Sequence, residues 1–231
     1  MTDTTTAPAP PRPVANTTAP AAPSDGYHHG DLREACITAG LRLLEEGGIE
    51  AVTIRGVARL TGVSHTAPLH HFPHREALLD AIAQRGFDRM LAGLAASVPD
   101  PVAPPAVQLR AYGLAYVDTA VASPRLFELM FGRPRDAVGE TAGFLLVDLC
   151  AAAIARGDLA GSDPLRLSHL LWSAVHGLAS LYVSGYLGSG FVTGETPDAH
   201  LAAVHLIDDL FGALEARTGG DRHIDTKGDF R

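Results

Sequence analysis

The sequence contains few cysteines, and their scarcity limits the kind of protein that it encodes. Only two occur in 231 residues, Cys36 and Cys150, so no disulfide framework is implied and a reducing compartment fits best. Both lie among Ala, Leu and Ile residues without an adjacent basic residue. We therefore expect small apolar core residues rather than reactive thiols.

Residues 1–26 are not expected to form a secretory signal peptide. Residues 1–26 have neither a basic start nor the apolar run of about 7 to 15 residues that such a signal needs. They hold six of the sixteen prolines and almost no large apolar side chain, which is typical of a disordered tail. Residues 218–231 are expected to form a second, flexible tail. These features predict a cytoplasmic protein.

Charged residues are missing from one long segment. Between Leu167 and Thr193 no Asp, Glu, Lys or Arg occurs, and a bilayer-spanning helix needs only about 20 apolar residues. However, His169 and His176 dilute the run, and Gly185 would fray its end in lipid. The segment therefore predicts a helix buried on several faces of a protein that does not span a membrane.

Positive charge is scarce overall. The 18 Lys and Arg residues face 26 Asp and Glu residues, and the formal net charge of -8 argues against coating nucleic acid or anionic membrane by bulk charge. One stretch departs from this balance, because residues 53–75 carry Arg55, Arg59 and Arg75 and no acidic residue. Such a stretch suits DNA phosphates if it folds as a DNA-binding motif, and is an ordinary solvated surface otherwise.

Alternating strand patterns are missing throughout, and apolar residues recur instead with helical spacing, so the fold class is expected to be all-α. Asp31, with Glu34 three residues later, forms a candidate capping box for a first helix over residues 31–46. A longer helix is expected over residues 74–97. Further helices are expected near residues 104–121, 124–131, 137–156, 163–187 and 197–217.

Two short helices are expected between the first two long ones. Thr53 is the candidate N-cap of a helix that ends at Gly62. Ser64 is the candidate N-cap of the next, whose first turn contains Pro68, where a missing N–H costs least. Two short helices joined by a turn with glycine make a helix-turn-helix, and the second helix is the one that enters a DNA major groove.

These residues resemble a known family. The segment VTIRGVARLTGVSHTAPLHHFPHREALLDAI is similar to the N-terminal domain of TetR-type (TetR/AcrR) transcriptional regulators. YHHGDLREA at residues 27–35 resembles the lead-in of one branch of that family, whose C-terminal domain carries the Trp and His-Gly that LLWSAVHGLASL supplies as Trp172, His176 and Gly177. The resemblance implies a three-helix DNA-binding domain with its connecting helix over residues 27–97. A C-terminal effector-binding and dimerisation domain would follow over residues 98–217.

The resemblance further implies a homodimer in which each subunit reads one half of a palindromic DNA operator. Thr53 and Arg55 would contact the DNA backbone and a base edge. Other residues of the motif would face the groove or bond phosphates. Leu69 stands where the family often has Tyr, and it would suit contact with a thymine methyl. His74 and Arg75 stand where the family often has Ser, Asp or Asn followed by Lys, which weakens a helix cap but keeps the charge. The candidate DNA-binding residues are Thr53, Arg55, Ser64, His65, Thr66, Leu69, His70, His71 and Arg75.

Four histidines crowd residues 62–79, and they raise the question of a metal. His70 and His74 are four residues apart, but Pro73 interrupts the helix that would bring them together. No cysteine or carboxylate pattern completes a site. We therefore expect no metal and no cofactor, and solvated or packing histidines remain an alternative for His70 and His74.

Motifs of enzymes are missing as well. The sequence has no nucleophile elbow, HExxH or phosphate loop, so we expect no catalytic residue. The glycines of GYLGSGFVTG do not follow a strand, and they predict a flexible connection between the last two helices.

The family's C-terminal domain holds a small-molecule pocket, and its last two helices pair with those of a second subunit. Mixed aromatic and aliphatic side chains with few charges favour an apolar or neutral aromatic effector, although aromatic residues at helical spacing also serve as plain core. The candidate pocket residues are Tyr112, Tyr116, Phe127, Met130, Phe131, Phe144, Trp172 and His176.

The sequence thus predicts a sequence-specific transcriptional regulator, a repressor by family habit, that a small molecule releases from DNA by shifting the connecting helix. The alternative is a helical protein that binds small molecules or metal and does not bind DNA. Arg55 and residues 64–71 separate the two, because only a DNA-binding protein requires them.

Overall fold

The computed structural model describes most of the chain between the two tails. The expected tails, residues 1–26 and 218–231, lie outside the described residues, as do the side chains of residues 29–31, 140–144 and 216. The described residues are 29–98, 100, 102–132, 140–161, 163–187 and 198–216.

The expected all-α class is confirmed, because the described residues contain helices and no strand. Eight of the helices are α-helices, and two short 3₁₀-helices, η1 and η2, stand on either side of α2. In chain order the elements are α1 (His29–Gly47), η1 (Ile49–Ala51), α2 (Ile54–Thr61), η2 (Ala67–His70), α3 (Arg75–Ala96), α4 (Pro105–Ala122), α5 (Pro124–Phe131), α6 (Glu140–Arg156), α7 (Pro164–Val183) and α8 (Ala199–Ala216).

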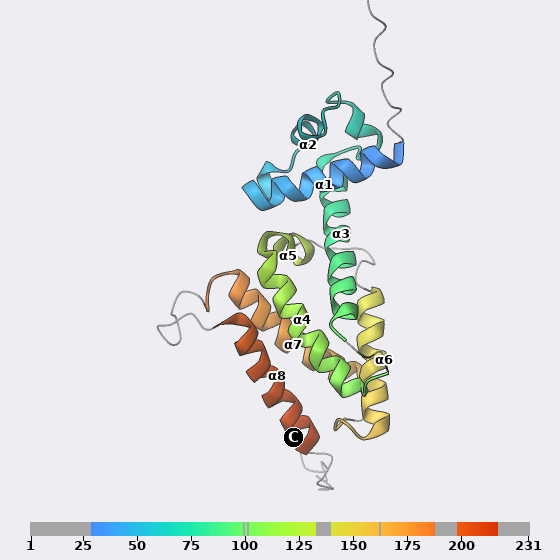
Figure 1. Cartoon of the computed structure of the whole chain (residues 1–231), viewed down its shortest axis with the longest axis vertical. Coiled ribbons are helices and arrows are strands. Elements are labelled where there is room, and N and C mark those ends of the chain that lie inside the picture. Colours follow the sequence, from blue (N-terminus) through green and yellow to red (C-terminus); the bar gives the residue numbers. More distant parts are fainter. Residues whose placement is uncertain are drawn as a thin grey trace, which may run out of the picture.

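The helices form an N-terminal unit and a C-terminal bundle that α3 connects. α1 and α2 lie at the top of Figure 1, and α3 runs from them down to the bundle. There α4 packs against α6, α7 and α8, while α5 lies under α1 and contacts both α1 and α3. The bundle is therefore joined to the N-terminal unit through α3 and α5.

Both cysteines are fully buried in the apolar core, as their neighbours predicted. Burial raises the pKa of the Cys36 thiol, and it raises that of Cys150 to about 11. Neither thiol is ionised near neutral pH, so both act as small apolar residues.

The start of α1 differs from the prediction. The helix begins at His29, so Asp31 lies inside its first turn and cannot be the N-cap residue of a capping box. The carboxylate of Glu34, the other half of the expected box, pairs instead with Arg33 and with Arg85 of α3. The Glu34 carboxylate thus joins α1 to α3.

α3 and α5 approach closely at Gly86. A Cβ atom at this position would lie 2.6 Å from Sδ of Met130 and 3.0 Å from a methyl carbon of Leu126. Only a residue without a side chain allows this separation, which brings the connecting helix into direct contact with α5.

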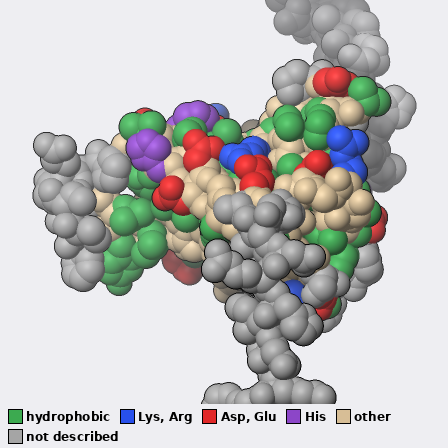
Figure 2. Space-filling model, turned by 90° about the horizontal axis from the view of Figure 1, so that it is seen from below, with side chains coloured by type: hydrophobic (Ala, Val, Ile, Leu, Met, Phe, Trp, Pro, Cys, Tyr) green, Lys and Arg blue, Asp and Glu red, His purple; other side chains and the backbone are tan. Residues whose placement is uncertain are grey.

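The long uncharged segment of the sequence folds mainly as α7, whose buried side chains face the bundle. Among the described helices none is both long and apolar enough to cross a membrane. Figure 2 shows the end of the molecule farthest from α2, where acidic and basic side chains are interspersed with hydrophobic ones.

Candidate DNA-binding and effector-binding sites

The two predicted boundaries of α2 are confirmed. The Thr53 hydroxyl accepts a hydrogen bond from the Gly56 N–H at 2.9 Å, which caps the N-terminus. At the other end Gly62 has a left-handed φ of 71°, and the Val63 N–H donates to the Ala58 carbonyl at 3.1 Å. α2 buries Gly56, Val57 and Ala58, and it leaves Arg55 and Arg59 exposed.

The second helix of the motif differs from the prediction. It is the 3₁₀-helix η2 rather than an α-helix capped by Ser64, and Thr66 occupies the N-cap position without a capping hydrogen bond from its side chain to a backbone N–H. Pro68, which is buried, has no N–H to offer the Ser64 carbonyl four residues earlier. The Ala67 N–H donates a hydrogen bond to the Ser64 carbonyl instead, at 3.0 Å.

Most of the candidate DNA-binding side chains are exposed along α2, η2 and the residues next to them. Leu69 is 42% exposed and so is accessible to a binding partner. His71 is half-buried beside Phe72, with ring centroids 6.4 Å apart. The exposed members of the set are Thr53, Arg55, Ser64, His65, Thr66, Leu69 and His70.

Arg75 is the member that the structure places differently. Its Nε donates to the Val52 carbonyl at 2.8 Å, and a terminal guanidinium nitrogen donates to the Ile49 carbonyl and lies 3.6 Å from the Glu50 carboxylate. The guanidinium is therefore bound to the segment that leads into α2.

His74 caps α3. Its Nδ1 accepts a hydrogen bond from the Ala77 N–H at 3.1 Å, so the imidazole takes the place of the usual Ser, Asp or Asn oxygen. The Glu76 carboxylate lies 3.8 Å from the same nitrogen. Within the described residues no group of three or more His, Cys, Asp or Glu side chains could hold a metal ion.

Four of the candidate effector residues meet in one aromatic cluster between α4, α5 and α7. Phe131 lies 4.7 Å from His176 and 4.8 Å from Phe127, measured between ring centroids. The hydroxyl of Tyr116 lies 2.7 Å from Nδ1 of His176. Trp172 extends the cluster, 5.5 Å from the His176 ring, and is 45% exposed.

The hydrogen bond inside this cluster joins two neutral groups. Burial lowers the pKa of His176 and raises that of Tyr116. A hydrogen bond with Trp172 lowers the Tyr116 pKa and offsets part of this rise. Near neutral pH the phenol keeps its proton and the imidazole is uncharged. In the Nε2–H tautomer, Nδ1 accepts a hydrogen bond from the Tyr116 hydroxyl.

The other candidate pocket residues lie around or outside the cluster. Met130 is buried and faces Gly86 of α3. Tyr112 is half-buried on α4. Phe144 belongs to α6, but its side chain lies outside the described residues.

Sequence reasoning missed Phe87, which joins the cluster from the connecting helix. Its ring meets that of Phe131 edge to face at 5.2 Å. Phe87 is an apolar residue within the helix expected over residues 74–97. No local signal in the sequence shows which ring from another helix it contacts.

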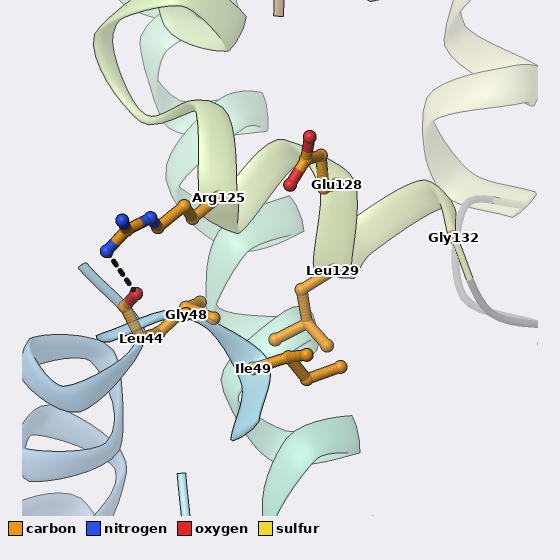
Figure 3. Close-up of a pocket in the computed structure, with 7 residues that line it drawn as sticks. All are labelled: Leu44, Gly48, Ile49, Arg125, Glu128, Leu129 and Gly132. Carbon is orange, nitrogen blue, oxygen red and sulfur yellow. Dashed lines mark hydrogen bonds between the residues drawn. The ribbon is translucent and has the colours of Figure 1, made fainter. Parts of the chain in front are cut away.

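Arg125 was also missed. It projects from α5 to the C-terminal end of α1, where its guanidinium donates to the Leu44 carbonyl at 3.5 Å (Figure 3). It also donates to the Glu45 carbonyl. Carbonyls in the last turn of a helix have no partner within the helix and carry partial negative charge, so a cation there is favourable. Beside this contact lies a pocket of about 190 Å³ lined by Leu44, Gly48, Ile49, Arg125, Glu128, Leu129 and Gly132.

Comparisons with known proteins agree with this arrangement. Residues 37–82 match the model described as bacterial regulatory proteins of the tetR family, and residues 109–210 match that of a tetracyclin repressor-like C-terminal domain. The HTH-type transcriptional regulator RutR of Escherichia coli K12 is 32% identical over 153 residues, covering 62% of this chain and 71% of RutR. The class C tetracycline repressor of E. coli is 44% identical over 52 residues, 22% of this chain and 24% of that protein.

The chain is also similar to a solved structure over a longer range. A protein of unknown function from Rhodococcus sp. RHA1 has a TM-score of 0.71 and 31% sequence identity, with 83% of this chain and 100% of that chain covered.

An exposed two-helix motif joined to a helical bundle defines a helix-turn-helix transcriptional regulator, a class whose members are not, in general, enzymes. The chain belongs to the TetR family. It is a DNA-binding repressor with a ligand-binding C-terminal domain.

Proposed function

We propose that this chain binds a palindromic operator as a homodimer and leaves it when a small molecule binds the C-terminal bundle. The observation that carries the proposal is the surface of α2 and η2, where Arg55, Arg59 and the exposed imidazoles occur without an acidic side chain from residue 53 to residue 75. The whole chain has a formal net charge of -8, which would repel DNA, so this surface is the one suited to it.

On the operator, we expect Arg55 at the N-terminal end of α2 to reach a base edge, since its guanidinium can form two hydrogen bonds with guanine. Ser64 and His71 are proposed to bond phosphates, and His65, Thr66 and His70 to face the groove. Leu69 would transfer its exposed side chain from water to a thymine methyl. Each operator half would lie about 34 Å or a little more from the other.

The dimer is proposed to form through α7 and α8. Leu170 and Leu181 of α7 and Leu201 of α8 are 48%, 44% and 52% exposed in the single chain. Gly177 and Gly212 stand on the same two helices, and a Cβ at either would meet no atom within 4 Å. A glycine inside a helix costs about 1 kcal/mol relative to alanine, which suits positions where a partner helix approaches closely.

The effector is proposed to bind at the aromatic cluster of Tyr116, Phe127, Phe131 and His176, next to the exposed Trp172. Packed rings with one neutral hydrogen-bonded pair favour an apolar or neutral aromatic molecule over a highly charged one. Tyr112, Met130 and Phe144 remain proposed as neighbours of this site.

The effector would act on DNA binding through α3. Phe131 contacts Phe87, and Met130 contacts the α3 backbone at Gly86, so a ligand that displaces α5 also displaces the connecting helix. The two recognition surfaces of the dimer would then lose the separation that the operator requires. A coupling of about 1–3 kcal/mol changes operator affinity by about 5- to 150-fold.

We further propose the boundaries 27–97 and 98–217 for the two domains, with tails at residues 1–26 and 218–231, and action in the cytoplasm. The YHHGDLR lead-in and the Trp172, His176 and Gly177 pattern support membership of the branch described above.

Selection of duplexes from a random-sequence pool by the purified chain tests the operator proposal. Enrichment of a palindrome, followed by saturable binding that survives EDTA and scrambled competitor and weakens steeply with salt, is the expected result. Failure to enrich any sequence would reject the operator proposal, and loss of binding in EDTA alone would indicate a metal at the histidines.

A further inference from the structure

The guanidinium of Arg75 joins the two ends of the DNA-binding motif. The residue follows η2 and opens α3. Its hydrogen-bond acceptors are the carbonyls of Ile49, the first residue of η1, and Val52, which follows η1 and directly precedes the Thr53 cap of α2. All the exposed candidate DNA contacts lie between these two ends. One side chain thus closes the segment that carries them.

The local chemistry does not otherwise explain an arginine here. The N-terminus of a helix carries partial positive charge, so a cation in the first turn of α3 is unfavourable for that helix. The two carbonyls compensate for this, and the side chain is 29% exposed. Glu50, whose side chain is 88% exposed, adds a solvent-screened contact of 3.6 Å.

The geometry of the contact requires a guanidinium. Nε and a terminal nitrogen of arginine lie in one rigid plane and donate in fixed directions, so they hold the two carbonyls at a set spacing. A lysine ammonium carries the same charge but has no such fork. A phosphate, in contrast, can accept from either side chain.

We propose that Arg75 is a positioning residue for operator recognition: it fixes the start of α2, and therefore Thr53 and Arg55, relative to η2. This rests on the proposed DNA-binding surface and deepens it. Arg75 acts on DNA through the placement of other residues, and a direct phosphate contact is not its main contribution.

Arg75→Lys separates this role from a phosphate contact. The test uses the full chain, a duplex that the wild type enriches from a random pool, and a scrambled duplex of equal length. If Arg75 positions α2, Arg75→Lys lowers affinity for the enriched duplex by roughly ten-fold. It leaves affinity for the scrambled duplex, and its dependence on salt, unchanged.

Arg75→Gln and Arg89→Gln complete the comparison. Arg75→Gln is expected to lose as much preference for the enriched duplex as Arg75→Lys, whereas Arg89→Gln, an exposed position further along α3, keeps the wild-type preference. The proposal is overturned if Arg75→Lys behaves as wild type while Arg75→Gln reduces the slope of log affinity against log salt by about 0.9 per lost phosphate contact.

A measurement on the wild type guards against variants that fold poorly. The Nε–H proton of Arg75, bonded to the Val52 carbonyl, should exchange slowly with solvent in the free chain and keep its NMR shift when duplex is added. Rapid exchange, or a large shift on binding, would overturn the proposal. If this proton exchanges slowly but the wild type prefers no duplex, the proposed operator recognition is rejected, while the contact between Arg75 and Val52 still holds.

Discussion

The ring of Phe87 on α3 meets the ring of Phe131 on α5 edge to face, with centroids 5.2 Å apart and planes at 73°. Phe131 also lies 4.7 Å from the ring of His176 on α7. One aromatic side chain thus touches both the connecting helix and the proposed effector site. A ligand that moves Phe131 changes a contact of α3 without any further intermediate.

The close approach of α3 and α5 predicts the effect of filling Gly86. Gly86→Ala places a methyl group 2.6 Å from Sδ of Met130. We expect a net loss of about 1 kcal/mol in the free energy of unfolding, because overpacking of about 1–3 kcal/mol exceeds the gain from replacing a helical glycine. Urea denaturation measures it.

Gly93→Ala is the matched control for Gly86→Ala. It lies on the same helix, but its added methyl would have only Thr119 at 3.8 Å as its nearest neighbour, so this variant should be as stable as wild type or up to about 1 kcal/mol more stable. In a Met130→Ala background, Gly86→Ala should no longer destabilise the chain. A loss that persists there would show that Met130 is not the source of the strain.

Replacing Arg55 tests the DNA surface. Arg55→Ala removes the exposed guanidinium next to the α2 cap, and we expect affinity for a selected duplex to fall by about 1–3 kcal/mol, with relaxed preference at the base that it contacts. Fluorescence anisotropy measures both. Arg42→Ala, an exposed arginine of α1 paired with Glu46, should change affinity little; equal losses in the two variants would indicate bulk charge alone.

A charge on the outer face of α7 tests the dimer. Leu170 is 48% exposed in the single chain, so Leu170→Glu should leave the stability of the subunit within about 0.5 kcal/mol of wild type. It should convert dimers to monomers in sedimentation experiments, because an unpaired carboxylate would be buried at the interface. Val102→Glu, at a position that is 86% exposed and outside α7 and α8, should remain dimeric. A dimeric Leu170→Glu chain would place the interface elsewhere.

The lowered pKa of His176 predicts a dependence of stability on pH. Desolvation makes the folded chain bind this proton more weakly than the unfolded chain, whose histidine has an ordinary pKa near 6.5. Stability is therefore fully present above that value and is lost as the pH falls from 6.5 toward the lower native pKa. Urea denaturation at a series of pH values measures it.

His176→Gln should remove this component of the pH dependence, and His70→Gln, at an exposed position in η2, should retain it. Tyr116→Phe keeps the ring but takes away the hydroxyl that lies 2.7 Å from Nδ1. It is expected to destabilise the chain by about 1–3 kcal/mol, because a half-buried acceptor loses its partner. A pH profile unchanged by His176→Gln would contradict the assignment.

The features that the sequence predicted correctly are those with local causes. Thr53 and Gly62 stand at the two ends of α2. The Thr53 hydroxyl bonds the N–H three residues later, and Gly62, which has no Cβ, adopts the left-handed conformation that ends the helix. Both effects involve only neighbours in the chain. Ser64 satisfied the same local rule and still failed as a cap, because Pro68 lacks the N–H that an α-turn starting there needs. Local patterns therefore give the position of the motif more reliably than the type of its second helix.

The contacts that the sequence could not predict join residues far apart in the chain. Arg125 reaches carbonyls about 80 residues earlier, and Arg75 reaches Ile49 and Val52. A backbone carbonyl is present at every position, so no residue type identifies it as a partner. Phe87 and Phe131 likewise become neighbours only when α3 and α5 are packed together.

Pro68 has a consequence for the DNA rather than for the protein. Its ring fixes one backbone angle of η2, and its burial holds the element against the core before any duplex is present. A recognition element that is already ordered loses little conformational entropy on docking, but it also cannot reshape itself to a poorly matching groove. The adjustment then falls to the double helix, so sequences whose base steps bend at low energetic cost will be preferred even where no side chain touches them.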